Sequence, residues 1–484
     1  MNVNGIFETS EAMRRAARTL APVVFGLLAL VVADCGGGGS SGSGAQATAR
    51  PLLYFSADDG IHGAELWVTD GTAGGTALVK DVFPGAGASN PAEGGYTLPR
   101  PMTVSDNQLF FAARNDIFNY ELWKTDGTGA GTVLVKDFSG GFNSSLPGEF
   151  VSFGGSLYFS NSSGVWHTDG TDAGTVLVTD QSLGWRRPII MGDAIFFSAV
   201  GAFESQLWKA DRFGAFQVKD IRLSTNIANP SGFAVFRGAL YFAAQDNFAT
   251  SLELWKSDGT GAGTTLVKDI NPNVQEPPFI SNLVVFNDAL YFSASDGAHG
   301  LELWKSDGTE LGTMMVKDIN LVPDPAFGGF RTSSSSPTSL TVFNGALYFF
   351  AGDQNGYSLW KTDGTDTGTV VVKQPGLVNP LFTSLTVANN WLYFAGDDGV
   401  HGLELWRTDG TDAGTTMVAD IFPGSQGSSP DKLTAYKDLL LFTADDGVAG
   451  RELWKSDGTA AGTVLVKDIN PGPAASNALG FMLF

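Results

Sequence analysis

Cysteine, histidine and basic residues are scarce in this chain of 484 residues. One cysteine and four histidines are present, which excludes internal disulfides and zinc sites built from several cysteines. Acidic residues outnumber basic ones 50 to 29, and the formal net charge is −21. A charge of this sign opposes binding to nucleic acids and to anionic lipid surfaces, but it permits neutral glycans, cationic partners and divalent cations. We therefore expect no nucleic-acid partner.

The N-terminal segment reads as an export signal. The apolar run Leu20–Val32 is too short to cross a bilayer as a helix, and three arginines precede it. This pattern is typical of the hydrophobic region of a signal peptide. Cys35 follows, and then a stretch rich in Gly and Ser. We predict a signal peptide over 1–34 and a flexible tether over 35–51.

The segment Val32-Ala33-Asp34-Cys35 resembles a bacterial lipobox. The resemblance implies that Cys35 is lipidated and becomes the mature N-terminus. Asp34 departs from the small residue that a lipobox has before the Cys. The expected location is the outer membrane or cell surface, with the lipid anchor as the only membrane contact. Plain secretion with a free thiol is the alternative.

From Leu52 onward the chain repeats one unit. Its central phrase is Glu-Leu-Trp-Lys-Ser-Asp-Gly-Thr, and its tryptophan returns about every 48 residues. The nine tryptophans are Trp67, Trp123, Trp166, Trp208, Trp255, Trp304, Trp360, Trp406 and Trp454. The phrase resembles the bacterial ELWxxDGT repeat family. The resemblance covers almost the whole region 52–484 and implies a surface or secreted repeat protein, but little about activity.

Each unit contains four short segments of strand character. In the unit 282–319 they are 282–286, 289–294, 301–305 and 314–319, rich in aromatic and β-branched residues. The first two are joined by two residues of the Asn, Asp or Gly type, which tolerate the positive φ of tight hairpins. A unit of four strands and about 48 residues has the size of a propeller blade. We predict an all-β, closed propeller of about nine four-stranded blades over 52–484.

The two ends of this region predict how the ring closes. The first unit lacks its first strand and begins at 52–55, whereas 478–484 resembles a lone first strand. The last strand could therefore complete the first blade, with Leu52 and Phe484 in one sheet. Nine blades exceed the usual four to eight, so two smaller rings are the structural alternative.

Two repeated features are expected to be structural. Both faces of the second and third strands are apolar, so each repeated Trp should pack between neighbouring blades. The Asp-Gly-Thr phrase should form a turn, because Asp can accept backbone N–H groups, Gly permits positive φ and Thr adds a side-chain bond.

The loops between the second and third strands carry carboxylates that could bind Ca²⁺ through hard oxygen ligands. Solvated turns are the alternative. The candidate metal ligands are Asp58, Asp59, Asp296, Asp397, Asp398, Asp445 and Asp446. These loops should share one face of the propeller with the variable connections between units, where binding sites are usually built.

The histidines do not indicate a catalytic base. His62, His299 and His401 occupy the same Gly-x-His-Gly position in different units, which favours a loop role. His167 replaces the Lys that follows Trp, and we expect it to be exposed. The repeat region 52–484 has no nucleophile-elbow, HExxH or phosphate-loop motif.

The unit around Trp208 departs most from the repeat. It lacks the Asp-Gly-Thr phrase, and a basic and aromatic cluster precedes it. Aromatic and guanidinium groups could stack on a sugar or pair with an anion. The candidate ligand-binding residues are Trp185, Arg186, Arg187 and Arg212.

We expect a monomeric, non-enzymatic binding or scaffold lipoprotein whose loop-rich face binds an extracellular glycan, peptide or protein. One alternative is a propeller-fold glycan hydrolase or lyase with non-repeated acids in a central pocket. A second is an adhesion or envelope-assembly scaffold that requires Ca²⁺. The fold alone does not decide between them.

Overall fold

In a computed structural model, Pro51–Phe484 forms one compact unit. The residues described by the structure are 51–92, 102–115, 120–138, 145–180, 183–200, 205–211, 214–221, 228–245, 252–271, 280–324, 332–373 and 384–484. Of 183–187 and 200 only the backbone is described. No helix in these ranges is both long enough and apolar enough to cross a membrane.

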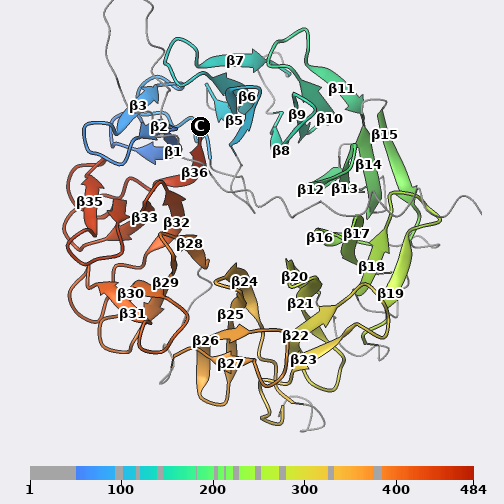
Figure 1. The fold of residues 1–484 in the computed structure, drawn as a ribbon. Coiled ribbons are helices and arrows are strands. Elements are labelled where there is room, and N and C mark those ends of the chain that lie inside the picture. Colours follow the sequence, from blue (N-terminus) through green and yellow to red (C-terminus); the bar gives the residue numbers. More distant parts are fainter. Residues whose placement is uncertain are drawn as a thin grey trace, which may run out of the picture. The chain divides into compact units, whose positions relative to one another are not determined.

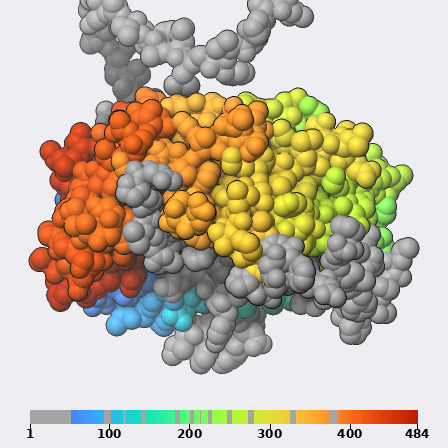
Figure 2. Space-filling model, turned by 90° about the horizontal axis from the view of Figure 1, so that it is seen from below, coloured from blue at the N-terminus to red at the C-terminus, as the bar shows by residue number. Residues whose placement is uncertain are grey.

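Nine four-stranded antiparallel sheets stand around a ring and form a nine-bladed β-propeller (Figure 1). This confirms the predicted fold. We number the blades in chain order and name the strands of each blade A to D, from the innermost to the outermost. In Figure 2 the blades follow one another side by side around the outer wall, from green through yellow to red.

The first four blades are as follows. Blade 1 contains β36 (Leu479–Leu483), β1 (Leu53–Asp58), β2 (Ala64–Thr69) and β3 (Ala77–Lys80). Blade 2 contains β4 (Thr103–Ser105), β5 (Gln108–Arg114), β6 (Tyr120–Thr125) and β7 (Val133–Lys136). Blade 3 contains β8 (Gly148–Phe153), β9 (Ser156–Asn161), β10 (Gly164–Thr168) and β11 (Val176–Thr179). Blade 4 contains β12 (Leu183–Met191), β13 (Ala194–Val200), β14 (Ser205–Asp211) and β15 (Gly214–Lys219).

The other five blades repeat this order. Blade 5 contains β16 (Ser231–Phe236), β17 (Ala239–Ala244), β18 (Glu253–Ser257) and β19 (Thr265–Lys268). Blade 6 contains β20 (Ser281–Phe286), β21 (Ala289–Ser295), β22 (Leu301–Ser306) and β23 (Met314–Lys317). Blade 7 contains β24 (Thr338–Phe343), β25 (Ala346–Asp353), β26 (Gly356–Thr362) and β27 (Val370–Val371). Blade 8 contains β28 (Thr386–Ala388), β29 (Trp391–Asp397), β30 (Leu403–Thr408) and β31 (Thr416–Ala419). Blade 9 contains β32 (Asp431–Tyr436), β33 (Leu439–Asp445), β34 (Arg451–Ser456) and β35 (Val464–Lys467).

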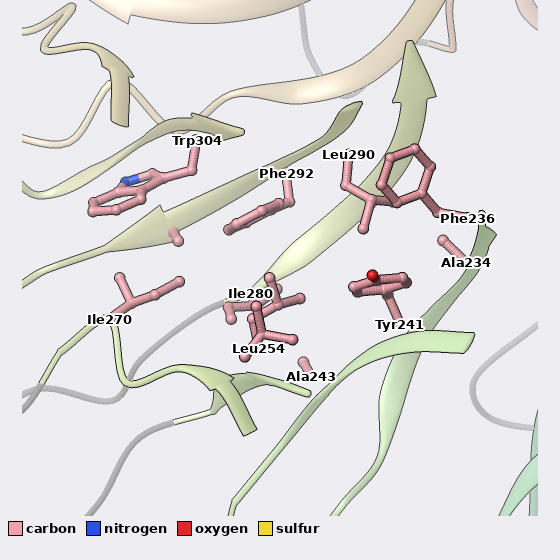
Figure 3. Packing of buried hydrophobic residues seen from close by; sticks show 12 residues of the cluster. Ala234, Phe236, Tyr241, Ala243, Leu254, Ile270, Ile280, Leu290, Phe292 and Trp304 are labelled. Atoms are coloured by element: carbon pink, nitrogen blue, oxygen red, sulfur yellow. The ribbon is translucent and has the colours of Figure 1, made fainter. Parts of the chain in front are cut away.

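Apolar side chains on both faces of strands B and C hold neighbouring blades together. Figure 3 shows the contact between blades 5 and 6, where Tyr241 and Leu254 of one blade meet Leu290, Phe292 and Trp304 of the next. Seven of the repeated tryptophans are 5–8% exposed, as expected for core residues. They are Trp67, Trp123, Trp255, Trp304, Trp360, Trp406 and Trp454. Trp166 and Trp208 are only half-buried.

The last strand closes the ring as predicted. Strand β36 pairs antiparallel with β1, and Leu53 lies opposite Leu483. Leu52 and Phe484 exchange two backbone hydrogen bonds, of 2.8 and 2.9 Å. The hydroxyl of Tyr436 in blade 9 also donates to the carbonyl of Pro51 (3.0 Å). Both ends of the propeller region therefore lie in blade 1, and a single nine-bladed ring replaces the alternative of two smaller rings.

Candidate functional site

The turn between strands C and D is a closed hydrogen-bond network. In blade 6 the Asp307 carboxylate accepts bonds from both the backbone N–H and the hydroxyl of Thr309, at 2.9 and 2.7 Å. The Thr309 hydroxyl oxygen then accepts the N–H of Gly312 (3.0 Å). Gly308 has φ +91°, a value that glycine adopts without strain. The Asp-Gly-Thr phrase thus forms the turn that the sequence predicts.

Each such C–D turn can also contact the preceding blade, as the turn of blade 7 does with blade 6. Lys305 of blade 6 donates from Nζ to the carbonyl of Gly364 in the turn of blade 7 (2.8 Å). A Cβ atom added to Gly364 would lie 2.1 Å from the hydroxyl of Tyr291 in blade 6. Glycine is therefore required here for its φ of +94° and for the close approach of the neighbouring tyrosine. We call this arrangement the regular junction.

The opposite face carries the B–C loops and the connections from strand D to the next strand A. In the B–C loop of blade 6, Asp296 accepts the backbone N–H groups of Ala298 and His299, at 2.9 and 3.0 Å. The other carboxylate oxygen lies 2.8 Å from Nδ1 of His299. This hydrogen bond raises the pKa of His299, because it stabilises the protonated ring. The pairs Asp59–His62 and Asp398–His401 repeat this geometry.

The other carboxylates proposed as metal ligands also accept N–H groups of their own loops. Asp58, Asp397 and Asp445 each accept the N–H two residues later, at 2.7–2.8 Å. Asp446 accepts the N–H groups of Val448 and Ala449. In the ranges that the structure describes, no three His, Cys, Asp or Glu side chains gather as a metal site would require. Calcium binding by these loops stays a prediction.

Sequence reasoning missed the role of the glutamate two residues before the repeated Trp. Glu302 is fully buried, and its carboxylate accepts the N–H groups of Ile319 and Ser335 at 3.0 and 2.9 Å. The Ser335 hydroxyl donates to the same carboxylate at 2.5 Å. Ser335 lies in the connection that leads to blade 7. We call this pair the Glu–Ser clasp.

The clasp joins two blades. The Ser335 carbonyl accepts the N–H of Gly352, at the end of strand B in blade 7 (2.8 Å). Corresponding pairs are Glu65–Ser89, Glu121–Ser145, Glu404–Ser428 and Glu452–Ser476. In blade 4, Gln206 and Ala228 occupy the two positions, and Gln206 Oε1 still accepts the N–H of Ile221. In blades 1, 2, 6, 8 and 9 these bonds fix the connection to the next blade against the ring.

Burial sets the protonation of the clasp. It raises the pKa of Glu302 to about 7, although the hydrogen bonds from Ser335 and from the backbone favour the carboxylate. The same cause raises the pKa values of Glu65 and Glu452 to about 7. These three glutamates therefore titrate in the neutral range rather than near the ordinary value of 4.5, and burial also raises the pKa of Glu404.

Three neighbouring blades present an exposed aliphatic side chain at the tip of the B–C loop. Ile61 of blade 1, Val400 of blade 8 and Val448 of blade 9 are 63–76% exposed. Blade 9 packs against both blade 8 and blade 1, so the three tips follow one another along the rim. Each stands beside the Asp-Asp pair of its loop. We call these three residues the aliphatic row.

The junction between blades 3 and 4 differs from the regular junction. A pocket of about 720 Å³ opens there, on the face of the A–B and C–D turns. Its wall includes Phe153, Tyr158, His167, Val178, Asp193 and Asp211. His167 is half-buried rather than exposed, because its ring lies 5.5 Å from that of Tyr158. The eroded unit around Trp208 contributes Asp193, Asp211 and Gly214 to this wall, and the other described wall residues belong to blade 3.

The structure places the remaining candidate residues only in part. Trp185, Arg186 and Arg187 lie in β12, the innermost strand of blade 4, and the backbone of Arg186 pairs with Ser198. Their side chains lie outside the description. Arg212 and Cys35 fall outside the described residues altogether. The proposed roles of these five residues stay predictions.

No protein-family model matches the chain, and the search of curated proteins gave no match. Solved structures do match at low identity. One reported as a prolyl endopeptidase is 12% identical, with a TM-score of 0.39, over 65% of this chain and 48% of that one. A puromycin hydrolase S511A mutant complexed with PGG is 14% identical, with a TM-score of 0.37, over 75% and 58% of the two chains. A structure of puromycin hydrolase is also 14% identical, with a TM-score of 0.36, over 72% of this chain and 59% of that one.

The matches span about half the length of those solved chains, and at such TM-scores they carry no argument about this protein. The resemblance of the repeat to the ELWxxDGT family stays a prediction.

Proposed function

We propose that the protein is an exported binding or scaffold lipoprotein without catalytic activity, which uses the loop-rich face of its propeller to bind an extracellular glycan, peptide or protein. The aliphatic row carries this proposal. Three consecutive loop tips with an exposed aliphatic side chain offer apolar surface for an interaction on this part of the rim. Aliphatic tips favour a peptide or protein over a sugar, because sugars offer mainly hydroxyl groups.

The charge around the row defines the partner further. Asp58 and Asp59, Asp397 and Asp398, and Asp445 and Asp446 stand beside the three tips. The whole chain is acidic as well, with a net charge of −21. Complementary potentials favour a partner surface that combines basic with apolar groups.

The loops are held in a way that suits recognition. Each Asp caps the backbone of its own B–C loop, and the Glu–Ser clasps fix the adjoining connections of blades 1, 8 and 9. A loop that is already ordered loses less conformational entropy when it binds. The row is thus presented on a pre-organised support.

Binding by the full chain to arrays of basic peptides and of neutral glycans tests the proposal. We expect basic, apolar peptides to bind, and the triple variant I61S/V400S/V448S to lose at least about tenfold in affinity, which corresponds to about 1.4 kcal/mol. Leu311→Ser is the matched control, because Leu311 is 90% exposed in a C–D turn on the other face. Equal binding by the triple variant and the parent would overturn the proposal.

Lipid anchoring at Cys35 is tested separately, by fatty-acid labelling of bacterial cells that express the full chain. Cells fed an alkyne-labelled fatty acid should incorporate the label into the full chain, and Cys35→Ser should abolish the incorporation. Label that persists in C35S, or protein that stays inaccessible to protease in intact cells, would contradict surface anchoring at Cys35.

A further inference from the structure

The regular junction has a lysine ammonium group at a fixed place. At five junctions the Lys after the repeated Trp donates from Nζ to the carbonyl of the glycine in the next C–D turn, at 2.8–3.3 Å. The five lysines are Lys209, Lys256, Lys305, Lys361 and Lys455. An ammonium group between two blades is thus part of the repeated architecture.

Both members of this contact are changed between blades 3 and 4. His167 stands in the lysine position, opposite Tyr158 of strand B, just as Lys305 stands opposite Tyr291 in blade 6. The following turn is a tight hairpin in which Asp211 pairs directly with Gly214, so the long Asp-Gly-Thr turn is missing. The pocket of about 720 Å³ lies at this place.

The wall of the pocket combines carboxylates with aromatic rings. Asp193, from the A–B turn of blade 4, and Asp211, from its C–D hairpin, contribute the carboxylates. Phe153 and Tyr158 contribute rings whose centroids are 5.9 Å apart. No lysine or arginine is among the described residues of the wall. The Asp193 carboxylate favours a cation, and the ring faces attract an ammonium group further.

The hydroxyl-bearing ring of Tyr158 borders the pocket. Tyr158 is 6% exposed and lines the pocket. In blades 5 and 6 the equivalent Tyr241 and Tyr291 are covered by glycines of the next C–D turn. Tyr158 lacks this cover and offers an acceptor and a donor to a guest molecule.

We propose that the pocket between blades 3 and 4 binds a primary alkylammonium group, such as a lysine side chain of a polypeptide or a free aliphatic amine. The guest ammonium takes the place that the repeat's own lysine has at the regular junction. Asp193 balances its charge, while Phe153, Tyr158 and Val178 contact its alkyl chain. This site lies on the face opposite the aliphatic row and does not depend on the function proposed for that row.

Ligand-observed NMR titration of the full chain tests the proposal with Nα-acetyl-lysine methylamide. We expect saturable binding that disappears when the Nε nitrogen is acetylated, because acetylation removes the charge. His167→Lys should weaken binding at least about tenfold, since its own ammonium group then occupies the place, as in five other blades. His167→Gln is the matched control and should stay within about threefold of the parent, while Asp193→Asn should weaken binding by a smaller factor than H167K.

Three further measurements distinguish recognition of the ammonium group from other causes of binding or of its loss. Binding of 1,5-diaminopentane beside the lysine compound supports recognition of the ammonium group itself, and the I61S/V400S/V448S variant should bind the amine like the parent. Thermal unfolding of H167K verifies that this variant is folded. The proposal is overturned if the parent does not prefer the lysine compound over its Nε-acetyl form, or if folded H167K binds as well as the parent.

Discussion

The junction between blades 6 and 7 and the junction between blades 3 and 4 are built from equivalent strands. Their packing differs. In the first, Tyr291 and Lys305 lie directly against the turn at Gly364. In the second, His167 and the short hairpin after Asp211 leave a pocket. A repeat protein can therefore open a pocket by losing a structural contact, without adding any new element.

The comparison also separates stability from recognition. Trp304, Gly364 and Glu302 each make contacts that are repeated around the ring, so their variants should weaken the fold. The pocket instead depends on two departures from the repeat, His167 in the lysine position and the short hairpin that follows Asp211. The following experiments test this division, beginning with the largest expected effect.

Replacing the repeated tryptophans should give the largest difference in unfolding free energy between the regular and the irregular junction. Trp304→Ala removes a side chain that is 6% exposed between blades 5 and 6. Loss of such a large buried group costs about 3–5 kcal/mol in unfolding free energy. Trp208→Ala should cost clearly less, because Trp208 is only half-buried at the irregular junction. Urea unfolding followed by far-UV circular dichroism measures both, and equal costs would contradict the division.

The glycine of the C–D turn gives the next largest effect. Gly364→Ala places a Cβ atom 2.1 Å from the Tyr291 hydroxyl and forces a φ of +94° on alanine. We expect a loss of about 2–3 kcal/mol from the clash and the left-handed backbone together.

The matched control is Gly74→Ala in the turn of blade 1, where nothing lies within 4 Å of the added atom. Adding Tyr291→Phe to Gly364→Ala should restore part of the loss, because it removes the hydroxyl from the clash. A Gly364→Ala variant as stable as the Gly74→Ala variant would refute the requirement for close approach.

The clasps predict a smaller effect that depends on pH. The folded protein holds the Glu302 proton more tightly than the unfolded chain does, because burial raises the pKa from 4.5 to about 7. The corresponding stability is present below about pH 4.5 and is lost as the pH rises through about 7. The melting temperature should therefore fall between pH 5 and pH 8, by about 1 °C for each kcal/mol lost.

Glu302→Gln should flatten part of this pH dependence, because the amide does not titrate. Blade 3 lacks this titrating group altogether, because Gly164 occupies the position that Glu302 has in blade 6. An unchanged profile in E302Q, or a melting temperature that rises towards pH 8 in the parent, would show that the clasps do not titrate in this range.

The sequence predicted the fold well because the strongest signals of a propeller are local and repeated. Pairs such as Asn287-Asp288 both have positive φ in the hairpins expected of them. The missing first strand of the first unit and the lone strand at 478–484 were sufficient to predict the pairing of β36 with β1. The strand bounds in blade 6 differ from the expected ones by no more than two residues.

The site could be predicted only as a region. The sequence singled out the unit around Trp208, but the pocket wall combines Tyr158 of one blade with Asp193 of the next, and such contacts appear only when the blades are assembled. Sequence reasoning also treated the repeated glutamate as part of a phrase. The sequence did contain a sign that the glutamate and the clasp serine are paired. In blade 4 both are replaced together, by Gln206 and Ala228.

Ring closure sets the order in which the protein can fold. Blades 2 to 9 each consist of four consecutive strands, so their contacts are local and can form quickly. Blade 1 must recruit a partner from the far end of the region, and the bond between Pro51 and Tyr436 alone spans 385 positions. The entropy of closing so long a loop is lost before the contacts compensate for it. The final kinetic phase of refolding should thus be the docking of β36, with an open arc of eight finished blades preceding it.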